Sequence, residues 1–239
     1  MADEPTLQRR ISEWHARTTE DAEGPWGERR RLARAMRRVI QHLVESGAPE
    51  NELAAAADAL EAFGDRLANH PQHQQYEGWA ETSPAGDVTA FFDKSPLIGL
   101  SNPLSPPISL ESDVENDRVL GHVRFGSAYE GPPGCVHGGW VAAAFDEVLG
   151  FANSLTGNPG MTGRLTVHYR KPTPLHTDLR FEARVDRVDG RKIFASSTLH
   201  AGELLTAESE GLFVSVAPET FRALIEKRRR KGVPKETSD

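Results

Sequence analysis

The sequence has little cysteine and no long apolar run. Cys135 is the single cysteine among 239 residues, so no disulfide can form within the chain, and we expect a reducing compartment, the cytoplasm. No run of about eighteen apolar residues exists, which predicts no membrane span. The first residues, MADEPTLQRRISEW, lack the apolar stretch of a signal peptide. The net charge of −7 gives no support to nucleic-acid binding.

Motifs for metals, nucleotides and cysteine chemistry are also missing. His168, His176 and His200 lack metal-ligand spacing, and no glycine-rich phosphate or dinucleotide motif is present. We therefore expect neither a metal nor a separate cofactor. Cys135 has no base in a triad pattern, so we interpret it as a small packing residue.

Hydrophobic periodicity predicts two helices in the first third of the chain, the second beginning near Pro49. The arginines between residues 29 and 38 fit a solvated helix face; an anion or membrane surface is the alternative. Residues 71–107, rich in Gly, Pro, Ser and Asn, predict a linker or surface loop. The first apolar stripe is Leu32, Met36, Val39, Ile40 and Leu43, and the second is Leu53, Ala56, Leu60, Phe63 and Leu67.

From residue 108 onward the apolar period changes to two, which predicts strands. Residues 179–186 alternate most cleanly between apolar and charged side chains. Asp189-Gly190 between two such runs predicts a type I′ hairpin, and Ala201-Gly202 a similar turn. We therefore expect a largely antiparallel sheet of five or six strands.

One helix interrupts these strands. Residues 140 to about 154 are apolar on nearly every side, which predicts a buried helix with the sheet curled around it. A last helix is predicted over residues 219–230 and ends in KRRRK. Basic residues there suit the negative end of the helix dipole, and a nucleic-acid patch is the alternative.

The segment GPPGCVHGGWVAAAFDEVLG carries the residues suited to chemistry. His137, Gly138 and Gly139 stand at the predicted start of the buried helix, where N–H groups lack helical partners. Without side chains at the two glycines, a ligand oxygen can approach these amides as in an oxyanion site; a tight packing corner is the other interpretation. Asp146, with Glu147 beside it, interrupts the apolar helix. It is either a catalytic acid or base near a cleft, or a group facing solvent or a salt bridge.

The spacing of Gly138 and Asp146 has a consequence for assembly. They are eight residues apart, which is about 12 Å along one helix. An oxyanion donor lies about 3 Å from the oxygen, and the attacking atom within about 3.5 Å of the carbonyl carbon. If both residues act on one carbonyl, they come from two antiparallel copies of the helix, which predicts a two-fold dimer with two sites at its interface.

The stretch HGGWVAAAFD resembles the HGG-six-residues-Asp signature of the PaaI-like branch of the hotdog thioesterase superfamily. Residues 162–172 carry its Thr-x-x-Leu-x-x-x-Tyr-x-x-Pro spacing, and residues 190–194 its Gly-Arg-Lys-x-Phe hairpin. NPLSPP and the N-terminal helices resemble thioesterase-superfamily-member proteins of animals and their bacterial relatives. The resemblance implies an α+β hotdog fold over residues 95–217, in which an antiparallel sheet wraps around a central buried helix. A helical extension and linker over 1–94, and a C-terminal helix and tail over 218–239, complete the expected organisation.

The same resemblance implies a cytoplasmic homodimer, or a dimer of dimers, that hydrolyses acyl-CoA to a carboxylic acid and coenzyme A. The Gly138 amide would polarise the thioester carbonyl, and Asp146 of the partner subunit would be the general base or nucleophile. His137 would orient the loop or hydrogen-bond the thioester region, and Thr162 would position the water or the carboxylate. Gly139 and four cations would bind coenzyme A. These cations are Arg170, Lys171, Arg191 and Lys192.

One position departs from the family pattern. PaaI enzymes carry an asparagine six residues before the histidine, where this chain has Gly131. The neighbouring Glu130 cannot donate a hydrogen bond when ionised. A non-catalytic acyl-CoA sensor or scaffold on the same fold is the alternative function, with the N-terminal helices as its partner surface.

Overall fold

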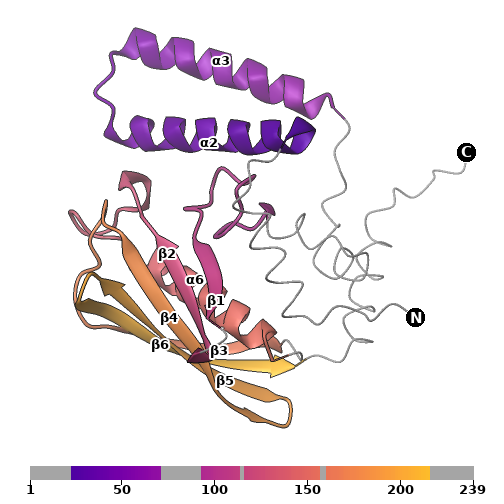
Figure 1. Ribbon diagram of the computed structural model, residues 1–239. Coiled ribbons are helices and arrows are strands. Elements are labelled where there is room, and N and C mark those ends of the chain that lie inside the picture. Colours follow the sequence, from indigo (N-terminus) through magenta and orange to yellow (C-terminus); the bar gives the residue numbers. More distant parts are fainter. Residues whose placement is uncertain (1–22, 71–92, 114–115, 157–159, 216–239) are drawn as a thin grey trace, which may run out of the picture.

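The computed structural model describes residues 23–70, 93–113, 116–156 and 160–215. A helical hairpin precedes an α+β domain (Figure 1). The predicted helix over residues 219–230 lies outside the described residues. The hairpin consists of α2 (Gly24–Glu45) and α3 (Glu50–Ala68). The domain consists of β1 (Ser109–Asp113), β2 (Arg118–Val123), the 3-10 helix η2 (Ser127–Tyr129), α6 (Gly138–Ser154), β3 (Gly160–Tyr169), β4 (Leu179–Asp189), β5 (Lys192–Ala201) and β6 (Leu204–Ser215).

The six strands form one antiparallel sheet, as the sequence predicted, and their order is β1-β2-β4-β5-β6-β3. This order makes β3 an edge strand, because within the described residues only β6 pairs with it. A bulge at Gly163 shifts the register of β3 between Thr162 and Arg164. Besides lying at the edge of the sheet, β3 lies alongside α6, so it borders the residues of that helix.

The β4–β5 turn differs in detail from the predicted type I′ turn. Asp189 pairs with Lys192, so the two turn residues are Gly190 and Arg191 rather than Asp189 and Gly190. Gly190 has a φ of 56°, and Arg191 is not among the residues with positive φ, whereas a type I′ turn needs positive φ at both positions. The strand pairing continues through Asp189, which moves the turn one residue along the chain.

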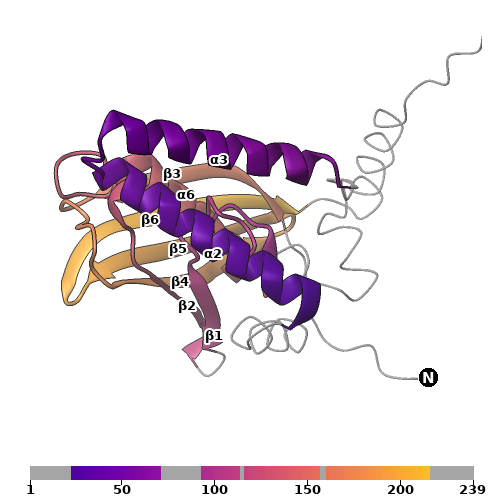
Figure 2. The same ribbon diagram turned by 90° about the horizontal axis from the view of Figure 1, so that it is seen from above.

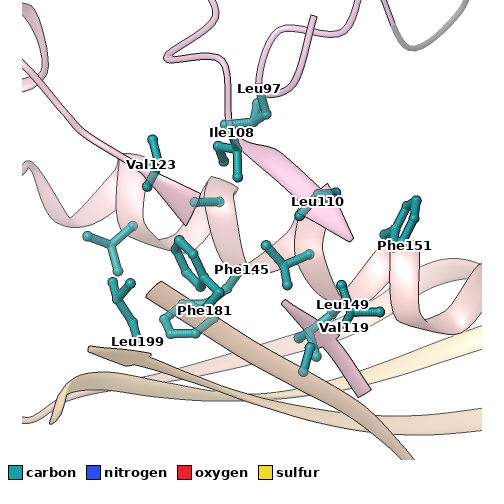
Figure 3. Close-up of a cluster of buried hydrophobic side chains, with 14 of the residues drawn as sticks. Leu97, Ile108, Leu110, Val119, Val123, Phe145, Leu149, Phe151, Phe181 and Leu199 are labelled. Carbon is teal, nitrogen blue, oxygen red and sulfur yellow. The ribbon is translucent and has the colours of Figure 1, made fainter. Parts of the chain in front are cut away.

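Helix α6 is buried, as its all-round apolar character predicted. Phe145, Val148 and Leu149 are fully inaccessible, and burying each such side chain contributes about 1.5–3 kcal/mol. The Phe145 ring packs edge-to-face on Phe181 of β4 with 5.2 Å between centroids. Figure 3 shows this cluster between α6 and the inner face of the sheet. The fold is therefore a sheet wrapped around one central helix. This packing holds α6 in a fixed position against the sheet.

Helix α2 contacts the domain with a polar face rather than with its apolar stripe. Arg30 and Ala33 are the buried residues of α2, and Arg30 Nε lies 3.0 Å from Asp93 Oδ1 in a buried ion pair. Arg37 donates to the Asn102 carbonyl at 2.7 Å. Of the predicted stripe, Leu32 and Met36 are half-buried, whereas its later residues are exposed and face away from the domain, as Leu43 does at 60% exposure.

Figure 2 shows α2 and α3 side by side, and Figure 1 shows α3 on the side of α2 that faces away from the sheet. Within the described residues, none of the helices has the length and apolar character needed to cross a bilayer.

Candidate active site

The N-terminus of α6 presents one backbone N–H group that has no partner. His137 is the N-cap residue, and its Nδ1 accepts a hydrogen bond from the Gly139 N–H at 3.0 Å. The Trp140 N–H donates to the His137 carbonyl at 2.9 Å. Nothing among the described residues accepts from the Gly138 N–H. This amide, at the positive end of the dipole of a 17-residue helix, is thus available to a ligand oxygen.

Two of the predicted residues therefore differ in what they can do. The Gly139 N–H is engaged by the His137 side chain, so Gly138 carries the single available donor of the pair. His137 acts here as a cap that fixes the start of the helix, which matches its predicted loop-orienting role. Because Nδ1 accepts, the imidazole proton of the neutral ring is on Nε2.

Tyr169 is a site residue to which the sequence assigned no role. Its hydroxyl, at the end of β3, donates to the Gly138 carbonyl at 2.8 Å. Its ring lies 3.4 Å from where a Gly138 Cβ would be. The side chain is 55% exposed, so it borders open space next to the Gly138 N–H. The Thr-x-x-Leu-x-x-x-Tyr-x-x-Pro spacing includes Tyr169, but it did not show that this side chain contacts the start of the helix.

Asp146 lies eight residues further along α6 and is only partly buried. Thr162 of β3 donates its hydroxyl hydrogen to Asp146 Oδ1 at 2.8 Å. This bond fixes the carboxylate and occupies one of its oxygens, which leaves the other available for chemistry. The predicted association of Thr162 with Asp146 is therefore present in the structure.

Glu147, the next residue, is turned into the protein. Burial and, to a smaller extent, the charge of Asp146 raise the pKa of Glu147 to about 7, although a hydrogen bond with the Ser95 side chain opposes the rise. The two adjacent carboxylates thus lie in different environments. Asp146 is the one beside the edge strand, and Glu147 faces the segment that precedes β1.

Asn153, near the end of α6, is a buried polar residue that the sequence did not single out. Its side-chain amide donates to the Gly160 carbonyl at 3.0 Å, and its oxygen accepts from the Gly160 N–H at 3.2 Å. These two bonds tie the start of β3 to the end of α6. They hold Thr162, two residues further on, in its place beside Asp146.

The loop before α6 explains the departure at Gly131. A Cβ at this position would lie 2.7 Å from His137 Cα, so no asparagine fits here without moving the helix cap. The Glu130 carboxylate accepts from the Gly134 N–H at 2.7 Å and braces the loop. The backbone of this loop therefore packs directly against His137. The Glu130 carboxylate is occupied by a hydrogen bond within the loop.

The four cations expected to bind coenzyme A divide into two pairs at opposite ends of β6. Arg170 forms an ion pair with Glu208, and Lys171 follows it at the end of β3. Arg191 donates to the Ser215 carbonyl at 3.0 Å, close to the start of β3. At about 3.3 Å per residue, the ten-residue β3 separates the pairs by roughly 30 Å within one copy. Lys192 is exposed beside Arg191.

Comparison with known proteins gives the class to which this fold and site belong. The family described as Thioesterase superfamily matches residues 133–208, which include the α6 and β3 site residues. The crystal structure of protein RHA08564, a thioesterase superfamily protein, superposes with a TM-score of 0.69 at 32% identity, covering 78% of this chain and 94% of that one. This chain therefore belongs to the thioesterase superfamily, and its domain is a hotdog fold. Because residues 95–217 make up about half of the chain, coverage of 78% also extends the similarity into the N-terminal part.

Curated relatives carry a more specific name. The chain is 35% identical over 95 residues to acyl-coenzyme A thioesterase THEM4 of Xenopus laevis, which covers 39% of this chain and 43% of the relative. It is 34% identical over 96 residues to the THEM4 thioesterase of Bos taurus, which covers 39% of each. The chain thus matches less than half of the length of these relatives.

Proposed function

We propose that this protein hydrolyses acyl-CoA thioesters to a free carboxylic acid and coenzyme A. The observation that carries the proposal is the Gly138 N–H without a partner at one end of α6, with Asp146, fixed by Thr162, further along the same helix. The first is suited to a carbonyl oxygen and the second to activating a nucleophile. The names of the THEM4 relatives support the acyl-CoA substrate.

The edge strand β3 suggests how the two groups reach one carbonyl. The ten-residue β3 pairs with β6 on one side, and no described strand pairs with its other side, so this edge can pair with a strand of a second chain. Antiparallel pairing about a two-fold axis near Leu165 and Thr166 would set Thr162 of one copy opposite Tyr169 of the other. Since Thr162 holds Asp146 and Tyr169 contacts Gly138, the partner's Asp146 would then face Gly138.

The proposed chemistry uses groups of the chain and needs no metal or redox cofactor. The Gly138 N–H donates to the thioester oxygen and stabilises the negative charge that develops there. Asp146 of the partner subunit removes a proton from water, the hydroxide adds to the carbonyl carbon, and the carbon–sulfur bond breaks. The thiolate of coenzyme A takes up the proton, so water and thioester become acid and thiol. Direct attack by the carboxylate, with a mixed anhydride that water then opens, gives the same products.

The pairing of β3 strands would also bring the two pairs of cations together. The end of one β3 would lie near the start of the other, so Arg170 and Lys171 would approach Arg191 and Lys192 of the partner subunit. Four cations around one site would suit the phosphates of coenzyme A. Within one copy, the same residues are too far apart to share a phosphate.

Replacement of Asp146 with asparagine tests the proposal. Asp146→Asn keeps the shape of the side chain and removes the base, so thiol release from acyl-CoA should fall by at least about a hundredfold. Asp178→Asn makes the same chemical change at an exposed position and should leave turnover unchanged. Near-normal turnover by Asp146→Asn would remove Asp146 from the mechanism. Tight acyl-CoA binding by the unaltered protein, without thiol release, would favour the sensor.

A further inference from the structure

Helix α3 makes few contacts with the rest of the described chain. None of its 19 residues is buried, and Leu53, Leu60 and Leu67 are each more than 40% exposed. Most helical stability in proteins comes from packing an apolar face against another element, and α3 buries none of its residues in this way. The sequence nevertheless places its leucines in one stripe. A surface outside α3 must therefore cover this stripe.

The adjacent face of α2 is equally uncovered. Val39, Ile40, Leu43 and Val44 are between 39% and 60% exposed, because α2 contacts the domain with its polar face. An apolar groove of about 520 Å³ runs between the two helices. Its lining includes Ala35, Arg38, Val39, His42, Leu43, Glu52, Leu53 and Ala56.

The two helices carry opposite charge. Helix α2 has six arginines and two glutamates, whereas α3 has five acidic residues and one arginine. No ion pair joins α2 to α3 anywhere in the part of the chain that the structure describes. Arg34 and Arg38 have no hydrogen bond or ion pair to any described residue. Within the hairpin Arg31 pairs with Glu28, whereas Arg34 and Arg38 are left without an acidic partner among the described residues.

We propose that the α2–α3 hairpin is an interface with the hairpin of a second copy of this chain. A two-fold axis parallel to the helices places α2 against the partner's α3 and α3 against the partner's α2. This arrangement covers both apolar stripes in a four-helix bundle and pairs the basic helix with the acidic one at both contacts. The interface does not use β3, so it joins copies independently of the proposed active-site dimer.

The mass of the assembly tests this interface. Leu43→Glu/Leu60→Glu places charges in the apolar stripes, and its mass by light scattering should be half that of the unaltered protein. Leu104→Glu changes an equally exposed leucine outside the hairpin and should leave the mass unchanged. If β3 also pairs, the change is from four copies to two with thioesterase activity retained; if it does not, the change is from two to one. Equal masses for both variants and the unaltered protein would overturn the interface.

Charge reversal separates contacts between copies from contacts within one. Arg34→Glu/Arg38→Glu and Glu52→Lys/Glu61→Lys should each lower the mass when alone, because α2 and the partner's α3 lose their attraction. Mixing the two variants restores complementary charges between copies but not within a copy, so the mixture should recover the larger mass. Failure of the mixture to recover would contradict pairing between copies.

Hydrogen exchange of the α3 amides shows what covers the apolar stripe of this helix. In the unaltered protein these amides should be protected, and in Leu43→Glu/Leu60→Glu they should exchange at least about tenfold faster. Protection that survives in this variant and disappears when residues 1–22 are deleted would show that the chain covers its own helix. That outcome would overturn the proposal.

Discussion

Replacing Gly138 with proline deletes one backbone N–H group and leaves the start of α6 in place. Proline suits the first position of a helix, and Gly138 is that position. His137, which would precede the proline, has φ −59° and ψ 131°, within the range that a residue before proline adopts. The Gly138 N–H donates to no described residue, so its loss removes none of the hydrogen bonds described above. The substitution therefore acts on the proposed oxyanion donor with little other change.

The expected size of the effect follows from this geometry. Loss of one oxyanion donor costs about 10²- to 10³-fold in kcat, which is about 2.7–4 kcal/mol. Stability should stay equal or rise by up to about 1 kcal/mol, because proline restricts the unfolded chain. Gly138→Ala is the matched control: its Cβ would lie 3.4 Å from the Tyr169 ring, an ordinary contact, and the N–H is kept. Thiol release and thermal unfolding, measured on both variants, give the comparison.

A mixture of two inactive variants tests which subunit supplies each group. In a heterodimer of Gly138→Pro and Asp146→Asn, one site contains both changes and the other contains neither, if the groups come from different copies. A statistical mixture should then regain about a quarter of the unaltered activity. Full turnover by Gly138→Pro would refute the role of the N–H group, and a mixture without any recovery would refute the shared site.

Three further substitutions test the surroundings of the site. Gly131→Ala places a Cβ 2.7 Å from His137 Cα, so the loop must move; we expect a loss of about 1–3 kcal/mol and slower thiol release. An unchanged melting temperature and rate would show that the loop yields freely. Asn153→Ala removes both bonds to Gly160 and should lower the free energy of unfolding in urea by about 1–3 kcal/mol. A smaller loss would mean that β3 begins correctly without this clamp. In the folded protein the pKa of Glu147 is about 7, above the ordinary 4.5. The protonated side chain therefore stabilises the fold fully below pH 4.5, and this contribution to the free energy of unfolding is lost as the pH rises through 7. Glu147→Gln should remove this slope and gain up to about 3 kcal/mol at pH 8, and parallel pH profiles would contradict the burial of a charge.

Patterns within short stretches of sequence predicted most of the domain. Alternation over residues 179–186 depends on neighbours one and two positions apart, and it gave the strand β4. Residues 140–154 are apolar on nearly every side, which predicted a buried helix, and this helix is α6. Asp146 stood out because a carboxylate interrupted that helix, and the structure places Thr162 against it.

Contacts between distant segments explain what the sequence could not predict. Arg30 of α2 pairs with Asp93, 63 residues away, so α2 contacts the domain through polar side chains and the later part of its apolar stripe is exposed. The contact of Tyr169 with Gly138 requires β3 to lie beside α6, which no local pattern specifies. The turn after β4 moved by one residue because strand pairing extends through Asp189.

The bulge at Gly163 sets which way Thr162 points. Thr162 and Tyr169 are seven positions apart, and in a regular strand an odd separation puts two side chains on opposite faces. The additional residue changes this parity: Thr162 stands opposite Phe213 and Tyr169 opposite Ala207, both of which face the interior. The unpaired Gly163 thus lets the side chains of one strand contact both the start and the middle of the same helix. Without it, the hydroxyl that anchors the carboxylate would point to the outside of the sheet.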